Sequence, residues 1–249
     1  MILGTRRHIK TQYTVLYKLY AIFTSVFDTL DGYLLNNDNY SSEYIDKRDK
    51  VLHEGSYLYF KNDIGCDITV HKGDVVLDLG ACMGEFSAYA CKKGALVYAF
   101  EPSIKNRYWL EKTVEYNKGT GQINICPFGA GSKSEVLNFV SDENNPGTSR
   151  FISENNQDTV QMEIVALDDW VIKENIKVDF IKADIEGFER NMLKGSVNIL
   201  KTQQPVLSLC TYHLPADPEV MKDIILSANP GYKIIQRRMK MYAYVPHLK

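Results

Sequence analysis

Short apolar runs alternate with helical segments from about residue 57 onward, and this alternation constrains the fold more than any other feature of the sequence. Val75–Leu79 and Ala95–Phe100 are predominantly apolar and show no regular alternation with polar residues. Such runs are typical of strands that are buried on both faces of a parallel sheet. Because strand, helix and strand follow one another, right-handed crossovers are expected. The pattern therefore predicts an α/β fold with a doubly wound, mostly parallel sheet.

Further elements of the same kind complete the predicted sheet. Helices are predicted at Phe86–Lys93, Ser103–Asn117, Phe188–Leu200 and Pro218–Ala228. Additional strands are predicted at Gln122–Phe128, Val178–Ala183, Val206–Thr211, Tyr232–Ile235 and Met241–Val245.

The middle of the chain has a different pattern. Glu135–Val140 and Val160–Leu167 look like strands, but Asp142–Asp158 between them is dense in Asn, Ser, Asp and Gly. A loop of this length inside a compact domain is usually functional or mobile. We expect it to act as a lid over a ligand, with a plain surface loop as the alternative. Asp168 and Asp169 are predicted to cap a short helix that follows.

Residues 1–50 are predicted to form a helical extension to a domain that covers residues 51–249. Apolar residues recur in the extension at helical spacing and produce one stripe. The residues of this stripe are Tyr13, Leu16, Tyr17, Tyr20, Phe23, Phe27 and Leu30. We expect a helix that packs on the main domain or on a second copy of the chain; a membrane-surface helix is the alternative. Charged residues at positions 18, 28 and 31 interrupt the stretch, so no membrane-spanning helix is expected.

The charge balance and the cysteines exclude some classes of protein. The chain has 29 basic and 31 acidic side chains and a net charge of −2, whereas a nucleic-acid binder usually carries a basic excess. The five cysteines are odd in number and include no C-x-x-C pair, which argues against a zinc ribbon or a redox pair. We therefore expect no nucleic-acid partner and a reducing compartment, the cytoplasm.

The segment Asp78–Phe86 follows a buried strand and opens a helix, which makes it the first candidate ligand site. Glycines at 80 and 84 allow a tight turn and a close approach of the backbone to a ligand. The start of the helix then presents free N–H groups to a polar or anionic group. The dinucleotide fingerprint G-x-G-x-x-G is absent, so a smaller ligand is expected. A glycine-lined turn without any ligand is the alternative.

Two acidic segments are predicted to lie at the same edge of the sheet as this turn. Glu101 closes the second strand, where a carboxylate can accept both hydroxyls of a ribose. Strand periodicity places Lys182 and Asp184 on one face, with Asp184 at the carboxyl end of its strand. Glu186 is expected to line the same crevice, whereas Glu189 is expected to cap a helix. Surface exposure for Glu101 and helix capping for the other acids are the alternatives.

These segments resemble the S-adenosylmethionine-dependent methyltransferases, and more closely the FkbM family. The family's pattern is matched by Gly73–Ala81, Phe100–Pro102 and Ile181–Glu189, and the run from Lys182 to Glu189 is the most specific part. The resemblance spans roughly residues 55 to 245. It implies a seven-stranded Rossmann-like sheet with a reversed last strand. It also implies methyl transfer from S-adenosylmethionine, commonly to a hydroxyl of a sugar or a related small molecule.

The resemblance also implies where the cofactor would bind. Its contacts would lie at Asp78, Gly80, Ala81, Gly84 and Asp184 for the methionine end, at Glu101 and Pro102 for the ribose, and at Ser103 and Phe128 for the adenine. The family has asparagine where this chain has Cys82, so a polar contact to the cofactor is missing. The turn Cys126–Gly129 contains no acid, so adenine recognition is expected to rest on main-chain groups and apolar packing.

His213 is the predicted general base. It follows the carboxyl end of the strand Val206–Tyr212, and an imidazole titrates near neutral pH. The resemblance supports this role, because a tyrosine–histidine pair often occurs here in sugar-directed members. Asp184 or Glu186 is expected to orient His213 or the acceptor. A histidine that only hydrogen-bonds a loop is the alternative.

Arg150, Glu186 and His213 are the predicted acceptor contacts. Arg150 lies in the predicted lid and can bind an anionic group or a sugar, including a nucleotide-linked sugar. The basic stretch Gln236–Lys240 is expected to be a solvated turn; contact with a phosphate of such an acceptor is the alternative.

Three alternatives remain open for the chemistry. Asp184, Glu186 and His213 can bind a divalent cation, magnesium or calcium, although no metal is favoured. The chain can be a nitrogen methyltransferase of the same fold. It can also be a catalytically silent cofactor-binding module whose N-terminal stripe is a partner interface; the Cys82 departure supports this alternative. The favoured function is O-methylation of a sugar or small metabolite during polysaccharide or natural-product assembly.

Overall fold

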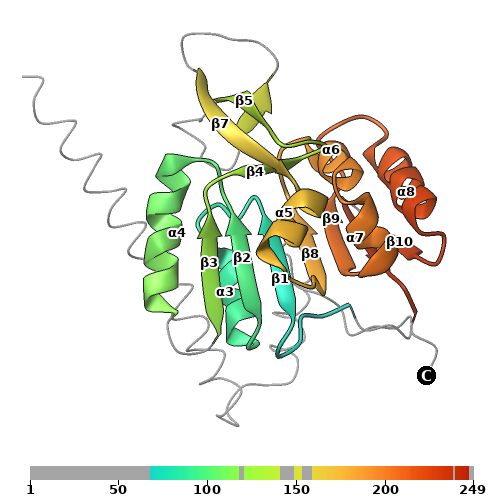
Figure 1. Cartoon of the computed structure of the whole chain (residues 1–249), viewed down its shortest axis with the longest axis horizontal. Coiled ribbons are helices and arrows are strands. Elements are labelled where there is room, and N and C mark those ends of the chain that lie inside the picture. Colours follow the sequence, from blue (N-terminus) through green and yellow to red (C-terminus); the bar gives the residue numbers. More distant parts are fainter. Residues whose placement is uncertain (1–67, 118–120, 141–148, 153–158, 238, 247–249) are drawn as a thin grey trace, which may run out of the picture. The chain divides into compact units, whose positions relative to one another are not determined.

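A seven-stranded sheet forms the centre of the computed structural model (Figure 1), which describes residues 68–117, 121–140, 149–152, 159–237 and 239–246. The strands are β1 (Val75–Leu79), β2 (Leu96–Phe100), β3 (Gln122–Cys126), β8 (Phe180–Ala183), β9 (Val206–Cys210), β10 (Lys233–Arg237) and β11 (Lys240–Tyr244). Their order is β10-β11-β9-β8-β1-β2-β3. Six of these strands run in the same direction, and β11 runs antiparallel to them. The predicted α/β fold class, with its mostly parallel seven-stranded sheet, is confirmed.

Helices cover both faces of this sheet. They are α3 (Glu85–Lys92), α4 (Ile104–Tyr116), α5 (Leu167–Glu174), α6 (Glu189–Lys194), α7 (Val197–Thr202) and α8 (Asp217–Ala228). Successive residues of β1 pack into different cores: Val76 lies with Phe86 of α3, whereas Leu77 lies with Trp170 of α5. Figure 1 shows α3 behind the sheet and α5 and α7 in front of it. Burial on both faces explains why the strand sequences lack polar alternation.

A second sheet lies beyond the carboxyl ends of the parallel strands (Figure 1). Its strands are β4 (Gly129–Gly131), β5 (Glu135–Val140), β6 (Arg150–Ile152) and β7 (Thr159–Ala166), in the order β4-β7-β5-β6. The sequence predicted β5 and β7 as strands but not the separate sheet. The predicted loop Asp142–Asp158 is wrong at Arg150–Ile152, because these three residues pair with the edge of β5.

The predicted helix Phe188–Leu200 is also wrong in part, since it is two helices, α6 and α7. Gly195 lies between them, and a Cβ there would be 2.0 Å from the main-chain oxygen of Gly131 in β4. The helix is therefore interrupted where β4 passes. Asp168 was predicted to cap its own helix, but its carboxylate accepts from the backbone N–H groups of Asn198 and Ile199 at 2.8 and 2.9 Å. It caps α7, and no side chain caps α5.

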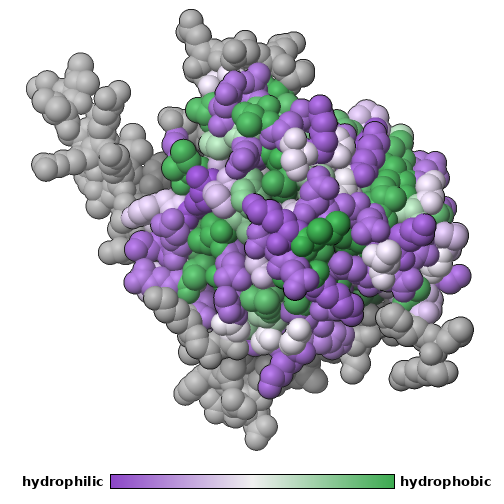
Figure 2. Space-filling model, in the orientation of Figure 1, coloured by the Kyte–Doolittle hydropathy of each residue, from purple (hydrophilic) through white to green (hydrophobic). Residues whose placement is uncertain are grey.

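Some predictions fall outside the described residues. These are the helical extension over residues 1–50, the domain boundary that follows it, and most of the predicted lid. None of the helices in the described part of the chain has the length and apolar character that crossing a bilayer requires. Hydrophobic and hydrophilic residues are intermixed on the face shown in Figure 2, as is ordinary for a folded domain.

Candidate active site

The turn after β1 brings two strand ends into direct contact. Gly80 has a φ of +72°, and a Cβ at this position would be 2.0 Å from the main-chain oxygen of Asp184 after β8. Only glycine fits between the two backbones. Gly84 serves a different contact, since a Cβ there would be 2.5 Å from Cδ1 of Leu110 in α4. The first glycine thus shapes the candidate site and the second allows α3 and α4 to pack closely.

Asp78 is fully buried and neutralised by the protein itself. Its Oδ1 lies 2.9 Å from Nζ of Lys182, and its Oδ2 accepts a hydrogen bond of 2.6 Å from the Ser87 hydroxyl. The Lys182 ammonium also donates to the main-chain oxygens of Leu79 and Gly80, at 3.3 and 2.8 Å. Burial lowers the pKa of Lys182, but the nearby carboxylates raise it by more, so its pKa stays above the ordinary value. Asp78 therefore holds the Lys182 ammonium against the main chain of the glycine turn.

Glu101 lies beside the same turn and is 4% exposed. One carboxylate oxygen accepts from the Cys82 N–H and the other from the Ser103 N–H, each at 2.8 Å. Burial raises its pKa to about 7, while these two hydrogen bonds act in the opposite direction. Glu101 is therefore a fixed acceptor whose charge changes near neutral pH.

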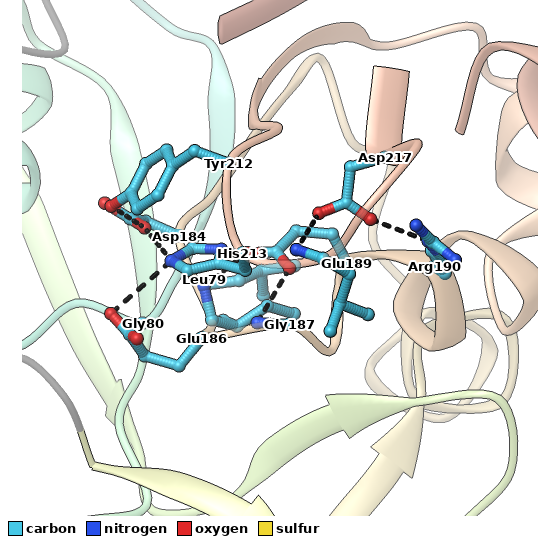
Figure 3. A network of polar contacts seen from close by, with 12 residues as sticks. Leu79, Gly80, Asp184, Glu186, Gly187, Glu189, Arg190, Tyr212, His213 and Asp217 are labelled. Carbon is cyan, nitrogen blue, oxygen red and sulfur yellow. Dashed lines mark hydrogen bonds and ion pairs between the residues drawn. The ribbon is translucent and has the colours of Figure 1, made fainter. Parts of the chain in front are cut away.

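An imidazole surrounded by three carboxylates forms the other half of the site (Figure 3). Nδ1 of His213 lies 3.0 Å from Oε1 of Glu189. Nε2 of His213 lies 3.5 Å from Oδ1 of Asp184 and 3.5 Å from Oε1 of Glu186. The Tyr212 hydroxyl donates to Oδ1 of Asp184 at 3.1 Å. We refer to Asp184, Glu186, Glu189 and His213 as the imidazole cluster.

Two groups of the imidazole cluster, His213 and Glu186, have pKa values above their ordinary values. Burial lowers the pKa of His213, but the hydrogen bond to Glu189 and the charges of the three carboxylates raise it by more. Burial also raises the pKa of Glu186, and the neighbouring carboxylates add to this, against the effect of His213. The imidazole thus binds its proton more strongly than an isolated histidine does.

Asp217 and Arg190 fix the loop that carries His213. Asp217, at the start of α8, accepts from the Leu214 N–H at 2.8 Å and from Nε of Arg190 at 2.6 Å. Arg190 also donates to the main-chain oxygen of Pro215. The buried Asp217 therefore connects this loop to α6, the helix that begins with Glu189 (Figure 3).

A pocket with about 540 Å³ of empty space, including its open mouth, joins the two halves. Of the predicted site residues, Gly80, Glu101, Pro102, Arg150, Asp184 and Glu186 line it. Asp78, Ala81, Gly84, Ser103, Phe128 and His213 do not, and His213 lies behind Asp184 and Glu186. The second sheet closes one side, with Phe151 of β6 packed between Phe139 and Phe188 at centroid distances of 5.0 and 5.3 Å.

The comparisons with known proteins decide the family. The model of the methyltransferase FkbM domain matches residues 67–234, which is well over half of the chain. The chain belongs to the FkbM methyltransferase family. Its match covers the glycine turn, the pocket and the imidazole cluster, so the methyltransferase class predicted from the sequence is confirmed.

One solved structure supports the fold of this FkbM methyltransferase, and two others show a weaker likeness. An FkbM methyltransferase from Methylobacillus flagellatus KT matches with a TM-score of 0.58 and 24% identity, over 75% of this chain and 47% of that one. The present chain thus spans about half the length of that protein. A fibrillarin/Nop5p complex matches at 18% identity and a TM-score of 0.42, over 80% of each chain. Fibrillarin from Methanococcus jannaschii, a pre-rRNA processing protein, matches at 12% identity and a TM-score of 0.43, over 71% of this chain and 67% of that one. No curated protein matches the chain.

The sequence missed two partners of this FkbM methyltransferase site. Lys182 was placed on the same face as Asp184, but its ion pair with Asp78 depends on the register between β1 and β8, where the two residues are direct partners. Glu189 was expected only to cap a helix, and its contact with His213 joins segments 24 positions apart. No local pattern in the sequence signals that contact.

A divalent cation is the alternative occupant of the imidazole cluster. Asp184, Glu186 and His213 each offer one ligand atom, and these atoms lie within 4.8 Å of one another. The same distances suit a protonated imidazole shared by two carboxylates, which needs no metal. Chelation distinguishes the two cases.

Proposed function

We propose that this FkbM methyltransferase uses S-adenosylmethionine to methylate a hydroxyl oxygen of a sugar or another small metabolite, in polysaccharide or natural-product assembly. One observation carries the proposal. His213 has Nδ1 against a buried carboxylate, while Nε2 faces Asp184 and Glu186 beside the pocket. This arrangement suits a general base next to a bound hydroxyl.

The residues around the glycine turn fit the proposed cofactor. The carboxylate of Glu101 accepts two backbone N–H groups and a side-chain hydrogen bond from Asn106, which leaves about one of its roughly four acceptor sites for a ribose hydroxyl. Gly80 brings the backbone to the pocket wall, where Asp184 and the start of α3 can receive the methionine end. We assign the adenine to the neighbourhood of Ser103 and Phe128. When bound, S-adenosylmethionine supplies an activated methyl group on a sulfonium.

The imidazole cluster then acts on the acceptor. Asp184 and Glu186 line the pocket and can accept hydrogen bonds from acceptor hydroxyls, which orients the reacting oxygen. Nε2 of His213 takes the proton that this oxygen loses as it is methylated. Because the pKa of His213 is raised, turnover should increase with pH until the imidazole is neutral.

The second sheet supplies the proposed acceptor wall. Phe151 and Phe188 present apolar rings, which suit the apolar face of a sugar ring. Arg150 on β6 is exposed and lines the same pocket, so it can bind an anionic group such as the phosphate of a nucleotide-linked sugar. A nucleotide-linked sugar combines these features.

Calorimetry followed by an acceptor screen tests the proposal. The protein should bind S-adenosylmethionine and S-adenosylhomocysteine with saturable heat, and it should yield an O-methylated product from monosaccharides or nucleotide-linked sugars, identified by mass spectrometry. Absence of heat and of any thermal shift would refute the cofactor assignment. Binding without turnover against the panel would favour the silent module, and a product methylated at nitrogen would favour the other enzyme class.

A further inference from the structure

Glu189 contacts three nitrogen atoms at once, which is more than a helix cap requires. Its carboxylate oxygens accept from the Ile185 N–H at 2.8 Å and from the Gly187 N–H at 3.0 Å. The oxygen that binds Ile185 also lies 3.0 Å from Nδ1 of His213. The side chain is 1% exposed, and Glu189 does not line the pocket. Figure 3 shows the carboxylate between the turn and the imidazole.

We propose that Glu189 is the positioning residue of this enzyme, which fixes the ring orientation and the tautomer of His213; this role rests on the proposed function. Glu189 is the carboxylate nearest the ring, and an ionised carboxylate only accepts hydrogen bonds, so we place the proton of the neutral ring on Nδ1. Nε2 then keeps its lone pair and faces Asp184 and Glu186 at 3.5 Å each. The imidazole is thereby ready to take a proton from the pocket side.

The neighbouring carboxylates are suited to a different task. Asp184 and Glu186 have side chains that are 12% and 23% exposed, and both line the pocket. They are farther from the imidazole than Glu189 and are reachable by an acceptor. The Tyr212 hydroxyl engages Asp184 rather than His213. Glu189 is therefore the carboxylate that holds the ring, and the other two face the substrate.

The same contacts connect the base to the turn that carries Glu186. Glu186 and Gly187 have φ angles of +54° and +97°, in the left-handed region. The two N–H groups bound by Glu189 flank Glu186, so one carboxylate fixes both this turn and the imidazole. Capping alone would explain the two N–H bonds but not the buried contact to His213.

Replacing Glu189 by Gln should separate positioning from plain structural support. The Gln amide carries no charge and its NH2 end cannot accept a hydrogen bond, so it cannot hold His213 and both backbone N–H groups as the carboxylate does. We expect kcat to fall roughly 100-fold, with little change in the KM for either substrate. The midpoint of the rising limb of the pH–kcat profile should move to lower pH, because the hydrogen bond and charge that raise the pKa of His213 are lost. Glu111→Gln, on the exposed side of α4, is the matched control.

Nitrogen-15 NMR of the histidine rings provides a readout that does not depend on activity. A His213→Asn variant identifies the His213 signals among the five histidines. In the wild-type protein, neutral His213 should carry its proton on Nδ1 and titrate above an isolated histidine; in Glu189→Gln the midpoint should fall. The proposal is overturned if the wild-type ring is protonated on Nε2, or if the midpoint is the same in both proteins. If the variant does not fold, the tautomer seen in the wild-type spectrum still tests the proposal. This readout needs no methylated product, so it also holds if no acceptor is found.

Discussion

The two halves of the pocket balance their charges in opposite ways. At the ends of β1 and β2, each acid has partners within the protein: Asp78 pairs with Lys182 at 2.9 Å, and Glu101 accepts two backbone N–H groups at 2.8 Å. At the ends of β8 and β9, three carboxylates share one imidazole at 3.0 to 3.5 Å. The first half is a closed framework, and we refer to it as the closed half, whereas in the second, the open half, several carboxylates share one imidazole.

This difference matches two tasks of a methyltransferase. A framework with satisfied polar groups can hold a large cofactor without rearranging, which preserves affinity. A cluster in which several carboxylates share one imidazole at longer separations is instead suited to accept hydrogen bonds and a proton from a substrate. The following experiments test whether the two halves respond differently to perturbation, beginning with the largest expected effect.

Lys182→Met should disrupt the closed half most strongly. The substitution leaves the buried Asp78 without its cation, and such a loss costs about 3–5 kcal/mol of unfolding free energy. Urea unfolding measures the loss. Lys112→Met is the matched control, because Lys112 forms an exposed pair with Glu115 at 3.2 Å, and such pairs contribute little to stability. Equal losses in the two variants would contradict the assignment of a closed, charge-balanced framework.

His213→Ala should affect chemistry in the open half rather than cofactor binding. We expect kcat to fall about 100-fold or more, with unchanged calorimetric affinity for S-adenosylhomocysteine. His71→Ala is the control, because that side chain is 55% exposed and precedes β1 at the other end of the strand. Unchanged turnover in His213→Ala would remove this histidine from the mechanism.

Cofactor affinity should fall as the pH is lowered below neutrality. Burial raises the pKa of Glu101 to about 7, and its ionised form is the better acceptor for ribose hydroxyls. One pH unit below that pKa, S-adenosylhomocysteine should bind roughly tenfold more weakly than at high pH. Calorimetry across this pH range measures the change. Glu101→Gln should abolish the dependence, and the same pH profile in that variant would rule out Glu101 as its source.

Chelation should have the smallest effect, because the proposed mechanism uses Nε2 of His213 as a base rather than as a ligand of a cation. Activity should be unchanged after dialysis against a strong chelator. Loss of activity that magnesium or calcium restores would instead assign Asp184, Glu186 and His213 to a metal.

The strands and the order of the acidic segments could be predicted because both depend on local sequence. Buried parallel strands such as β1 and β2 are apolar on both faces, so their runs are easily recognised. The second sheet gives a weak signal, because β4 is only Gly129–Gly131 and β6 is three residues within a polar segment. The helix break at Gly195 depends on the approach of β4, which no local pattern encodes.

The sequence could predict which residues lie at the strand ends beside the pocket, but not the direction of their side chains. Glu101, Asp184 and Glu186 line the pocket as expected, since the carboxyl ends of parallel strands meet at one edge. Asp78 lies at the same edge but points to Lys182 across the β1–β8 register. Glu189 meets His213 only through packing of α6 against the loop after β9. Such contacts between distant segments follow from tertiary structure alone.

A crystal structure with S-adenosylhomocysteine bound tests the central claim most directly. The account predicts that the ribose hydroxyls contact Glu101 and that the open side of the sulfur faces Asp184, Glu186 and Nε2 of His213. A nucleoside bound away from Glu101, or a sulfur that faces away from the imidazole cluster, would contradict it.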